Sequence, residues 1–189
     1  MVRYIAFLRG INVGGHQVKM DELRRSFEAL GLRKVATFIT SGNLIFESDE
    51  ADATRLTGRI EGHLRDALGY DVPTFLRTDT ELARIADHQP FPDLAARDGD
   101  SSYVAFLYKR PAAAAARAVA ALSNDTDRVL VHDRELYWHI RGGLTDSTLG
   151  APSLEKALGA VPTTVRNVKT VRRLAAKYPP AGPARAGRT

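Results

Sequence analysis

The first residues that could do chemistry form the loop Arg9–Lys19, between an apolar run and an amphipathic segment. Glycines let backbone amides approach a ligand closely, and the start of the following helix would attract an anion. Arginine and lysine would add positive charge, and asparagine would add neutral hydrogen bonds. We therefore expect a site for a phosphate or carboxylate group, to which the loop contributes Arg9, Gly10, Asn12, Gly14, Gly15 and Lys19.

A second segment, Ser41-Gly42-Asn43, is expected to complete this site. In a split βαβ unit, the loop after the first strand and the hairpin between the second and third strands lie at one end of the sheet. A purely structural loop is the alternative, because a tight hairpin alone accounts for Gly42 and local turn chemistry for Asn43. The glycine spacing also fits neither the P-loop nor the dinucleotide-binding fingerprint, so a nucleotide is not specifically indicated.

Other residue types offer less chemistry. The chain has no cysteine, which excludes disulfides, thiolate metal sites and a cysteine nucleophile. The five histidines are His16, His63, His88, His132 and His139. They lack the spacing of metal ligands, so we expect neither a metal nor a cofactor, and only His16 is a candidate acid or base. Ser41 is not a nucleophile-elbow serine, because a hairpin follows it where that motif needs a helix.

Hydrophobic periodicity predicts the elements that would position the loop. In the first half we expect strands at Val2–Leu8, Val35–Thr40, Asn43–Ser48 and Val72–Arg77, with helices at Met20–Leu30 and from about Asp52 to Leu68. Thr78 and Glu81 form a capping box that would start one more helix.

The chain repeats itself. Tyr4–Leu8 returns as Tyr103–Leu107, and Val72–Arg77 is echoed by Val161–Arg166, which favours a duplicated module over chance similarity between apolar strands. In the second half we expect strands at Tyr103–Lys109, Arg128–Val131, Glu135–Ile140 and Thr163–Arg166, and helices at Pro111–Leu122, Ser153–Leu158 and Val168–Lys177. The second copy connects its first strand and helix through Lys109-Arg110-Pro111 alone, so the module does not require a loop as long as Arg9–Lys19.

This order predicts an α+β fold built from two ferredoxin-like (split βαβ, βαββαβ) units, each with an extra C-terminal helix. Each sheet would be antiparallel, with helices on one face. The expected boundaries are a first module at 1–88, a linker at 89–101, a second module at 102–177 and a disordered basic tail at 178–189. The sequence does not tell whether the two modules share one sheet.

The distribution of charge along the chain bears on whether nucleic acid is the partner. The net charge is +5, but five basic residues and no acidic one lie in 172–189, which leaves residues 1–171 formally neutral. A nucleic-acid-binding protein needs basic residues clustered on its folded body, so nucleic acid is only an alternative partner. The strand aromatics alternate as core residues do; they are Tyr4, Phe7, Phe38 and Phe46. No apolar run reaches the roughly 20 residues that span a bilayer, and no signal peptide is indicated, so a soluble cytoplasmic protein is expected.

Four motifs, LRGINVGG, KMDELR, TSGNLIFES and LEKALG…TTVRN, give the chain a resemblance to the bacterial family of domain of unknown function 1697. The resemblance covers residue 1 to about 177 and implies an α+β fold and a soluble bacterial protein, with no assigned activity. Taken together, the sequence favours a protein that binds a small anionic molecule. An enzyme acting on a phosphorylated or carboxylated metabolite, a nucleic-acid-binding protein and an interaction protein are the alternatives, and the oligomeric state stays open.

Overall fold

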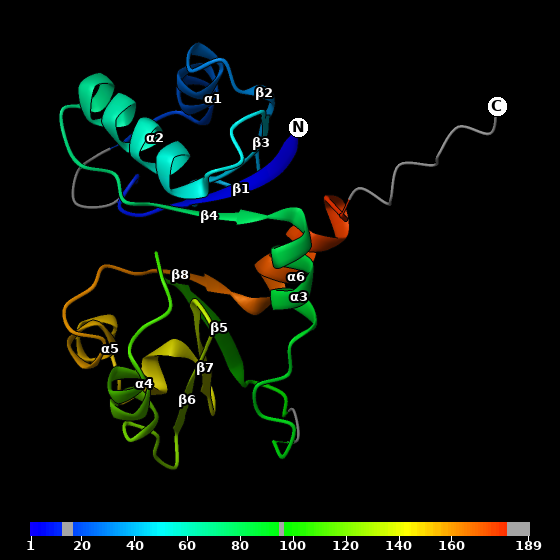
Figure 1. Ribbon diagram of the computed structural model, residues 1–189. Helices are drawn as coiled ribbons and strands as arrows, with labels where there is room; N and C mark the ends of the chain where they lie inside the picture. Colours follow the sequence, from blue (N-terminus) through cyan, green and yellow to red (C-terminus); the bar gives the residue numbers. More distant parts are fainter. Residues whose placement is uncertain (13–16, 95–96, 181–189) are drawn as a thin grey trace.

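The apolar run at the N-terminus forms strand β1 (Val2–Leu8), which is buried on both of its faces. Tyr4 and Ala6 join one hydrophobic cluster, and Ile5 and Phe7 join another. A strand covered on both sides must lie in the middle of a layered structure. The computed structural model describes residues 1–12, 17–94 and 97–180 and has this arrangement (Figure 1).

The two halves contain the same strands and α-helices in the same order. The first half consists of β1, α1 (Met20–Ala29), β2 (Arg33–Thr37), β3 (Asn43–Ser48), α2 (Ala53–Leu68), β4 (Thr74–Thr78) and α3 (Asp79–Asp87). The second consists of β5 (Ser101–Phe106), α4 (Ala113–Ala120), β6 (Asp127–His132), β7 (Glu135–Ile140), α5 (Ala151–Ala157), β8 (Thr164–Asn167) and α6 (Val168–Lys177), with a short 3-10 helix, η1 (Leu144–Asp146), between β7 and α5. The described residues between α3 and β5 form neither helix nor strand.

Each half has its own four-stranded antiparallel sheet, in the order β2-β3-β1-β4 and β6-β7-β5-β8. The equal orders agree with the predicted duplication. The sequence did not tell whether the two halves share one sheet, and the structure shows that they do not.

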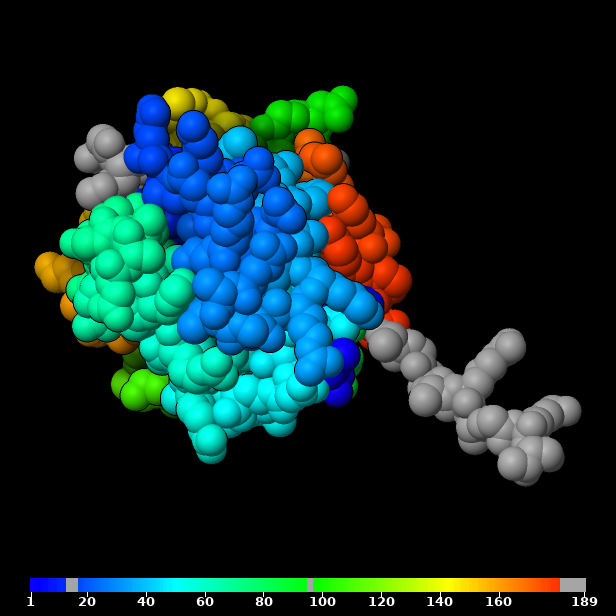
Figure 2. All heavy atoms as spheres, turned by 90° about the horizontal axis from the view of Figure 1, so that it is seen from above, coloured from blue at the N-terminus to red at the C-terminus, as the bar shows by residue number. Residues whose placement is uncertain are grey.

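The sheets pack face to face, with helices outside and at one side. One cluster lies between the first sheet and α1 and α2, and a matching cluster lies between the second sheet and α4 and α5. The third cluster joins the two sheets with α3 and α6, and its centre is the stacked pair Phe7 and Phe106, whose ring centroids are 4.0 Å apart. Figure 2, seen from above, shows α1 and α2 over the first sheet and α6 emerging at its side.

Most predicted elements are confirmed to within a few residues, and the differences have local causes. Strand β2 ends at Thr37, not Thr40, because Ile39 has a φ of 53° that extended backbone does not adopt. The Thr78–Glu81 capping box at the start of α3 is present as predicted. Within the described residues, no helix combines the length and apolar character needed to cross a membrane. Most of the predicted basic tail lies outside the described residues.

Candidate functional site

The loop after β1 meets the hairpin turn, as predicted, and it also contacts the entry to β4. The Leu8 amide donates to the Gly42 carbonyl at 2.8 Å, and the Arg9 amide donates to the Pro73 carbonyl at 2.9 Å. These bonds place the described start of the glycine-rich loop beside Ser41-Gly42-Asn43. Of the predicted site residues, Gly14 and Gly15 lie outside the described residues, as does the candidate acid or base His16.

Arg9 is engaged with the other half of the molecule. Its guanidinium contacts both carboxylate oxygens of Glu155 on α5, the nearer at 2.5 Å, and donates to the Thr163 carbonyl at 3.1 Å. The duplicated position, Tyr108, does the same for the first half, because its hydroxyl donates to Glu61 on α2 at 2.6 Å. Arg9 therefore holds the two halves together, whatever else it binds.

The polar side chains of the turn are also engaged within the protein. Asn12 accepts from the Val18 amide at 2.8 Å and donates to the Thr40 carbonyl at 3.2 Å, so it ties the described ends of the loop to the hairpin. Asn43, fully buried, donates to the Phe38 carbonyl and to the Ser41 hydroxyl. Among the predicted cations, only Lys19 has a side chain without a hydrogen-bond or ion-pair partner among the described residues.

Two arginines at equivalent positions of the repeat, Arg77 and Arg166, cross between the halves. Arg77 donates to the Leu107 carbonyl and to Glu135, the latter at 2.6 Å. Arg166 donates to the Leu8 carbonyl and to the amide oxygen of Asn43, the latter at 2.7 Å. Asn43 is thus a structural acceptor for a buried cation.

The two buried cations differ in charge balance. Burial lowers the pKa of Arg77 and raises that of Glu135, and their mutual attraction opposes both shifts. Arg166 has neutral partners, and burial lowers the pKa of its guanidinium to about 10. Both arginines fasten one half to the other and leave little donor capacity for a ligand.

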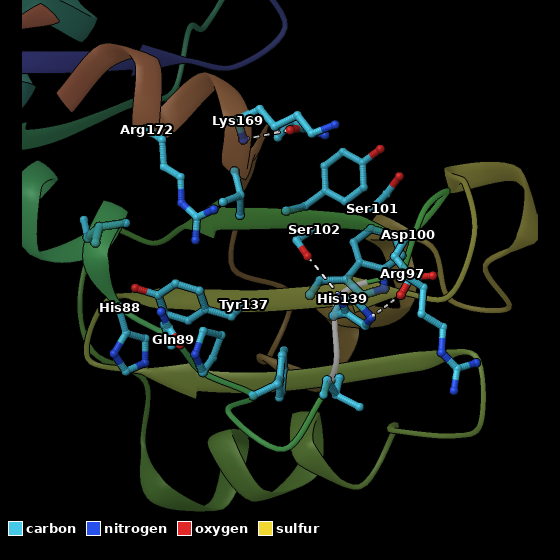
Figure 3. Close-up of a pocket in the computed structure, with 18 of the residues that line it drawn as sticks. His88, Gln89, Arg97, Asp100, Ser101, Ser102, Tyr137, His139, Lys169 and Arg172 are labelled. Atoms are coloured by element: carbon cyan, nitrogen blue, oxygen red, sulfur yellow. Dashed lines mark hydrogen bonds and ion pairs between the residues drawn. The ribbon is translucent and has the colours of Figure 1, made fainter. Parts of the chain in front are cut away.

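A cavity of about 500 Å³ lies between the end of α3, the connection from α3 to β5, the second sheet and the start of α6. This volume suits a small molecule. Apolar walls come from Ile85, Phe91, Leu94, Tyr137, Trp138 and Val168. Polar groups enter from β5, β7, the connection and the first turns of α6, and Figure 3 shows them around one space.

Three of these polar residues, Ser102, His139 and Asp100, form a chain of contacts. Ser102 on β5 and His139 on β7 are register partners, and the Ser102 hydroxyl lies 3.0 Å from Nδ1 of His139. On the other side of the ring, Nε2 lies 3.5 Å from a carboxylate oxygen of Asp100. The second Asp100 oxygen accepts from the Gly142 amide at 3.1 Å, which fixes the carboxylate. The His139 and Asp100 side chains are 11% and 12% exposed, so the chain is close to solvent but largely shielded.

Positive charge reaches the same cavity from α6. Nε of Arg172 donates to the Ala86 carbonyl at 3.3 Å, and its two Nη atoms have no hydrogen-bond partner among the described residues. Lys169, one turn earlier on the helix, also lines the cavity. In Figure 3 the Arg172 side chain hangs from α6 on the side of Tyr137, with Ser102, His139 and Asp100 grouped beyond.

Sequence reasoning missed this constellation. His139 shares a hairpin with His132, but the register pairs His132 with Glu135 and His139 with Arg128, so the two histidines are not opposite. Asp100 belongs to a segment predicted as linker. The available signal was the strand register, because β5 must pair with β7 to place Ser102 beside His139. Within the described residues, no three acidic or histidine side chains come together as a metal site would require.

The comparisons with known proteins concern family and fold. The family model described as a protein of unknown function, DUF1697, matches residues 1–137. A solved structure of the conserved bacterial protein SP0830 from Streptococcus pneumoniae is similar, with a TM-score of 0.64 and 24% identity over 94% of this chain and 98% of that one. No curated protein matches the sequence. The family match covers well over half of the chain, and the protein belongs to the DUF1697 family.

Proposed function

We propose that the protein binds a small molecule with a carboxylate or phosphate group in the cavity between the α3–β5 connection and the second sheet. The observation that carries this proposal is the cavity of about 500 Å³ with the Nη atoms of Arg172 beside it. Small-molecule sites are mostly apolar, with a few polar groups that fix orientation, and this composition matches. The arginine would bind the anionic group through paired hydrogen bonds.

The glycine-rich loop is a second proposed site for the same class of ligand. Its support is Lys19, which is exposed and whose side chain has no hydrogen-bond or ion-pair partner among the described residues, in a loop whose described start contacts the hairpin turn at Gly42. It ranks below the cavity because the side chains of Arg9, Asn12 and Asn43 already form hydrogen bonds with other protein groups.

Nucleic acid is a weaker proposal. The four aromatics that the sequence places on strands and that could have stacked on bases are buried: Tyr4, Phe7, Phe38 and Phe46. Base recognition by a sheet requires exposed rings. Binding through the basic C-terminal residues alone would be weak and steeply salt-dependent.

We also propose that each half of this α+β fold is a ferredoxin-like unit. Its support is the strand order β2-β3-β1-β4, in which β1 and β3 form the centre and each βαβ connection skips one strand. The repeat of that order in the second half supports one ancestral module.

A melting-temperature screen over small carboxylates and phosphates tests the cavity. A ligand at a hundredfold excess over its Kd should stabilise the protein by roughly 2.7 kcal/mol. The Arg172→Gln variant should lose this response and keep nearly the parental melting point without ligand. Arg173→Gln is the matched control, since it removes the same charge from the same helix at a side chain that lies over Phe38. An equal loss of response in both variants would mean general electrostatics, and an unchanged response in Arg172→Gln would refute the cavity as the site.

A further inference from the structure

We propose that Ser102 is a nucleophile and that the protein hydrolyses small carboxylic esters that bear an anionic group. The inference rests on the proposed function, because the substrate would occupy the same cavity. Its basis is the contact chain of Ser102, His139 and Asp100. The His139 ring lies between the Ser102 hydroxyl, 3.0 Å from Nδ1, and the Asp100 carboxylate, 3.5 Å from Nε2.

The partners decide the protonation pattern of His139. Because the Asp100 carboxylate only accepts hydrogen bonds, we assign the ring hydrogen to Nε2, which faces it. In the neutral imidazole, Nδ1 is then the acceptor, and the Ser102 hydroxyl donates to it. This is the arrangement in which a histidine acts as general base towards a serine. Contacts of this kind are often long before substrate binds, and the 3.5 Å distance is compatible with that.

The first half serves as an internal comparison. There, the residues at the corresponding register positions are Arg3 and Glu47, which form an ion pair at 3.9 Å. Arg3 is paired with Asp79 as well, and donates to the Pro179 carbonyl. The module therefore does not need a serine, a histidine and an aspartate at this end of the sheet. In the second half, the corresponding end of the sheet carries Ser102, His139 and Asp100, and all three line the cavity.

The reaction balances without a cofactor. The Ser102 oxygen forms a bond to the carbonyl carbon of the ester, and its proton passes to Nδ1 of His139. When the bond from the carbonyl carbon to the leaving oxygen breaks, that oxygen takes the proton and departs as the alcohol. Water then attacks the acyl-serine with His139 as base, which releases the acid and restores the Ser102 hydroxyl.

The other residues have distinct parts. Asp100 is a positioning residue that acts through His139. Arg172 and Lys169 favour substrates with a negative group, because both line the cavity and Arg172 retains unpaired donors among the described residues. The expected substrates are therefore small anionic esters in preference to neutral ones.

Labelling with a fluorophosphonate, which reacts with activated serines, tests the nucleophile directly. Peptide mass analysis of the labelled protein should locate the adduct on Ser102, and Ser102→Ala should abolish it. Ser153→Ala, at an exposed serine near the start of α5, is the control and should label as the parent does. Because the adduct is located on the unaltered protein, the result stands even if the variant folds poorly. Absence of an adduct on Ser102 would overturn the proposal.

Hydrolysis of two chromogenic esters tests the substrate class. Mono-4-nitrophenyl succinate should be turned over with a higher kcat/KM than 4-nitrophenyl acetate, and His139→Gln should lower kcat about 10²- to 10⁴-fold for both. Asp100→Asn should lower kcat with little change in KM, whereas a merely structural role would change KM or stability and not the turnover of bound substrate. Equal rates with neutral and anionic ester would overturn the substrate class.

The two proposals can fail separately. If Arg172-dependent binding of small anions is found and no adduct or turnover is, the hydrolase inference is wrong and the binding site stands. If an adduct forms on Ser102 but no anion stabilises the protein, the nucleophile stands and the anionic binding site falls.

Discussion

At the scale of single residues, buried polar groups decide the local structure. Asp127 is fully buried at the start of β6, and its carboxylate accepts from the Ser147 and Thr148 hydroxyls, the Trp138 indole and the Thr148 amide. Burial alone would raise the pKa of this carboxyl, but hydrogen bonds from Ser147, Trp138 and Thr148 outweigh it, and the pKa is lowered. The ionised carboxylate thus joins the loop after β7 to the second sheet.

We predict that Asp127→Asn lowers the free energy of unfolding at neutral pH by about 2–3 kcal/mol, because the charge-assisted bonds are lost. A carboxyl whose pKa is lowered by folding stabilises the protein at pH values above its pKa in the unfolded chain. This contribution disappears as the pH falls through the folded-state pKa. The difference between parent and variant in urea unfolding should therefore shrink below about pH 4. Asp125→Asn, at an exposed neighbour, is the control and should change stability little at any pH. A difference that stays constant down to pH 2 would contradict this account.

At the scale of elements, the hairpin turn before β3 is built around one glycine. Gly42 has a φ of 71°, and a Cβ there would lie 2.8 Å from Cγ2 of Ile11 and 3.2 Å from Cβ of Leu8. The turn thus packs directly on the described start of the glycine-rich loop. Gly69, at the C-terminal cap of α2, has a φ of 80° but nothing within 4 Å of the added Cβ.

The two glycines separate backbone strain from packing. Gly69→Ala should cost about 1–2 kcal/mol, the penalty for a left-handed backbone alone. Gly42→Ala should cost about 1–3 kcal/mol more, since Ile11 or Leu8 must shift in a packed core. Thermal unfolding of both variants measures the difference. Equal losses of unfolding free energy in the two variants would show that Ile11 shifts away from the added methyl group without destabilising the protein.

At the scale of the whole molecule, the two halves form one packed body. Their sheets share a hydrophobic cluster, and Arg9, Arg77 and Arg166 each reach from one half into the other. Because the inner face of either sheet would be exposed without its partner, the halves should fold and unfold together. We therefore expect the two halves to behave as a single cooperative unit.

The single tryptophan, Trp138, lies in the outer cluster of the second half and reports on this cooperativity. Phe27 lies in the outer cluster of the first half, and Phe27→Ala should cost about 3–5 kcal/mol. We predict that this variant shifts the urea transition seen by Trp138 fluorescence together with that seen by circular dichroism. An unmoved Trp138 transition would mean that the halves unfold independently.

The sequence by itself determined the elements and their repetition. Periodicity in Val2–Leu8 and in the α2 segment, and the Thr78–Glu81 capping box, are local patterns that depend on neighbours along the chain, so they could be predicted. The echo of Tyr4–Leu8 in Tyr103–Leu107 indicated the duplication for the same reason. The meeting of the glycine-rich loop with Ser41-Gly42-Asn43 followed from the βαββαβ order.

Only the tertiary structure decided what those residues do. Arg9 and Asn43 have the chemistry of ligand-binding residues, but their partners, Glu155 and Arg166, lie in the other half of the chain. The cavity and the contacts of His139 with Ser102 and Asp100 likewise depend on strand register and on the path of the α3–β5 connection. Contacts between residues distant in sequence arise from the packing of whole elements, and no local pattern encodes them.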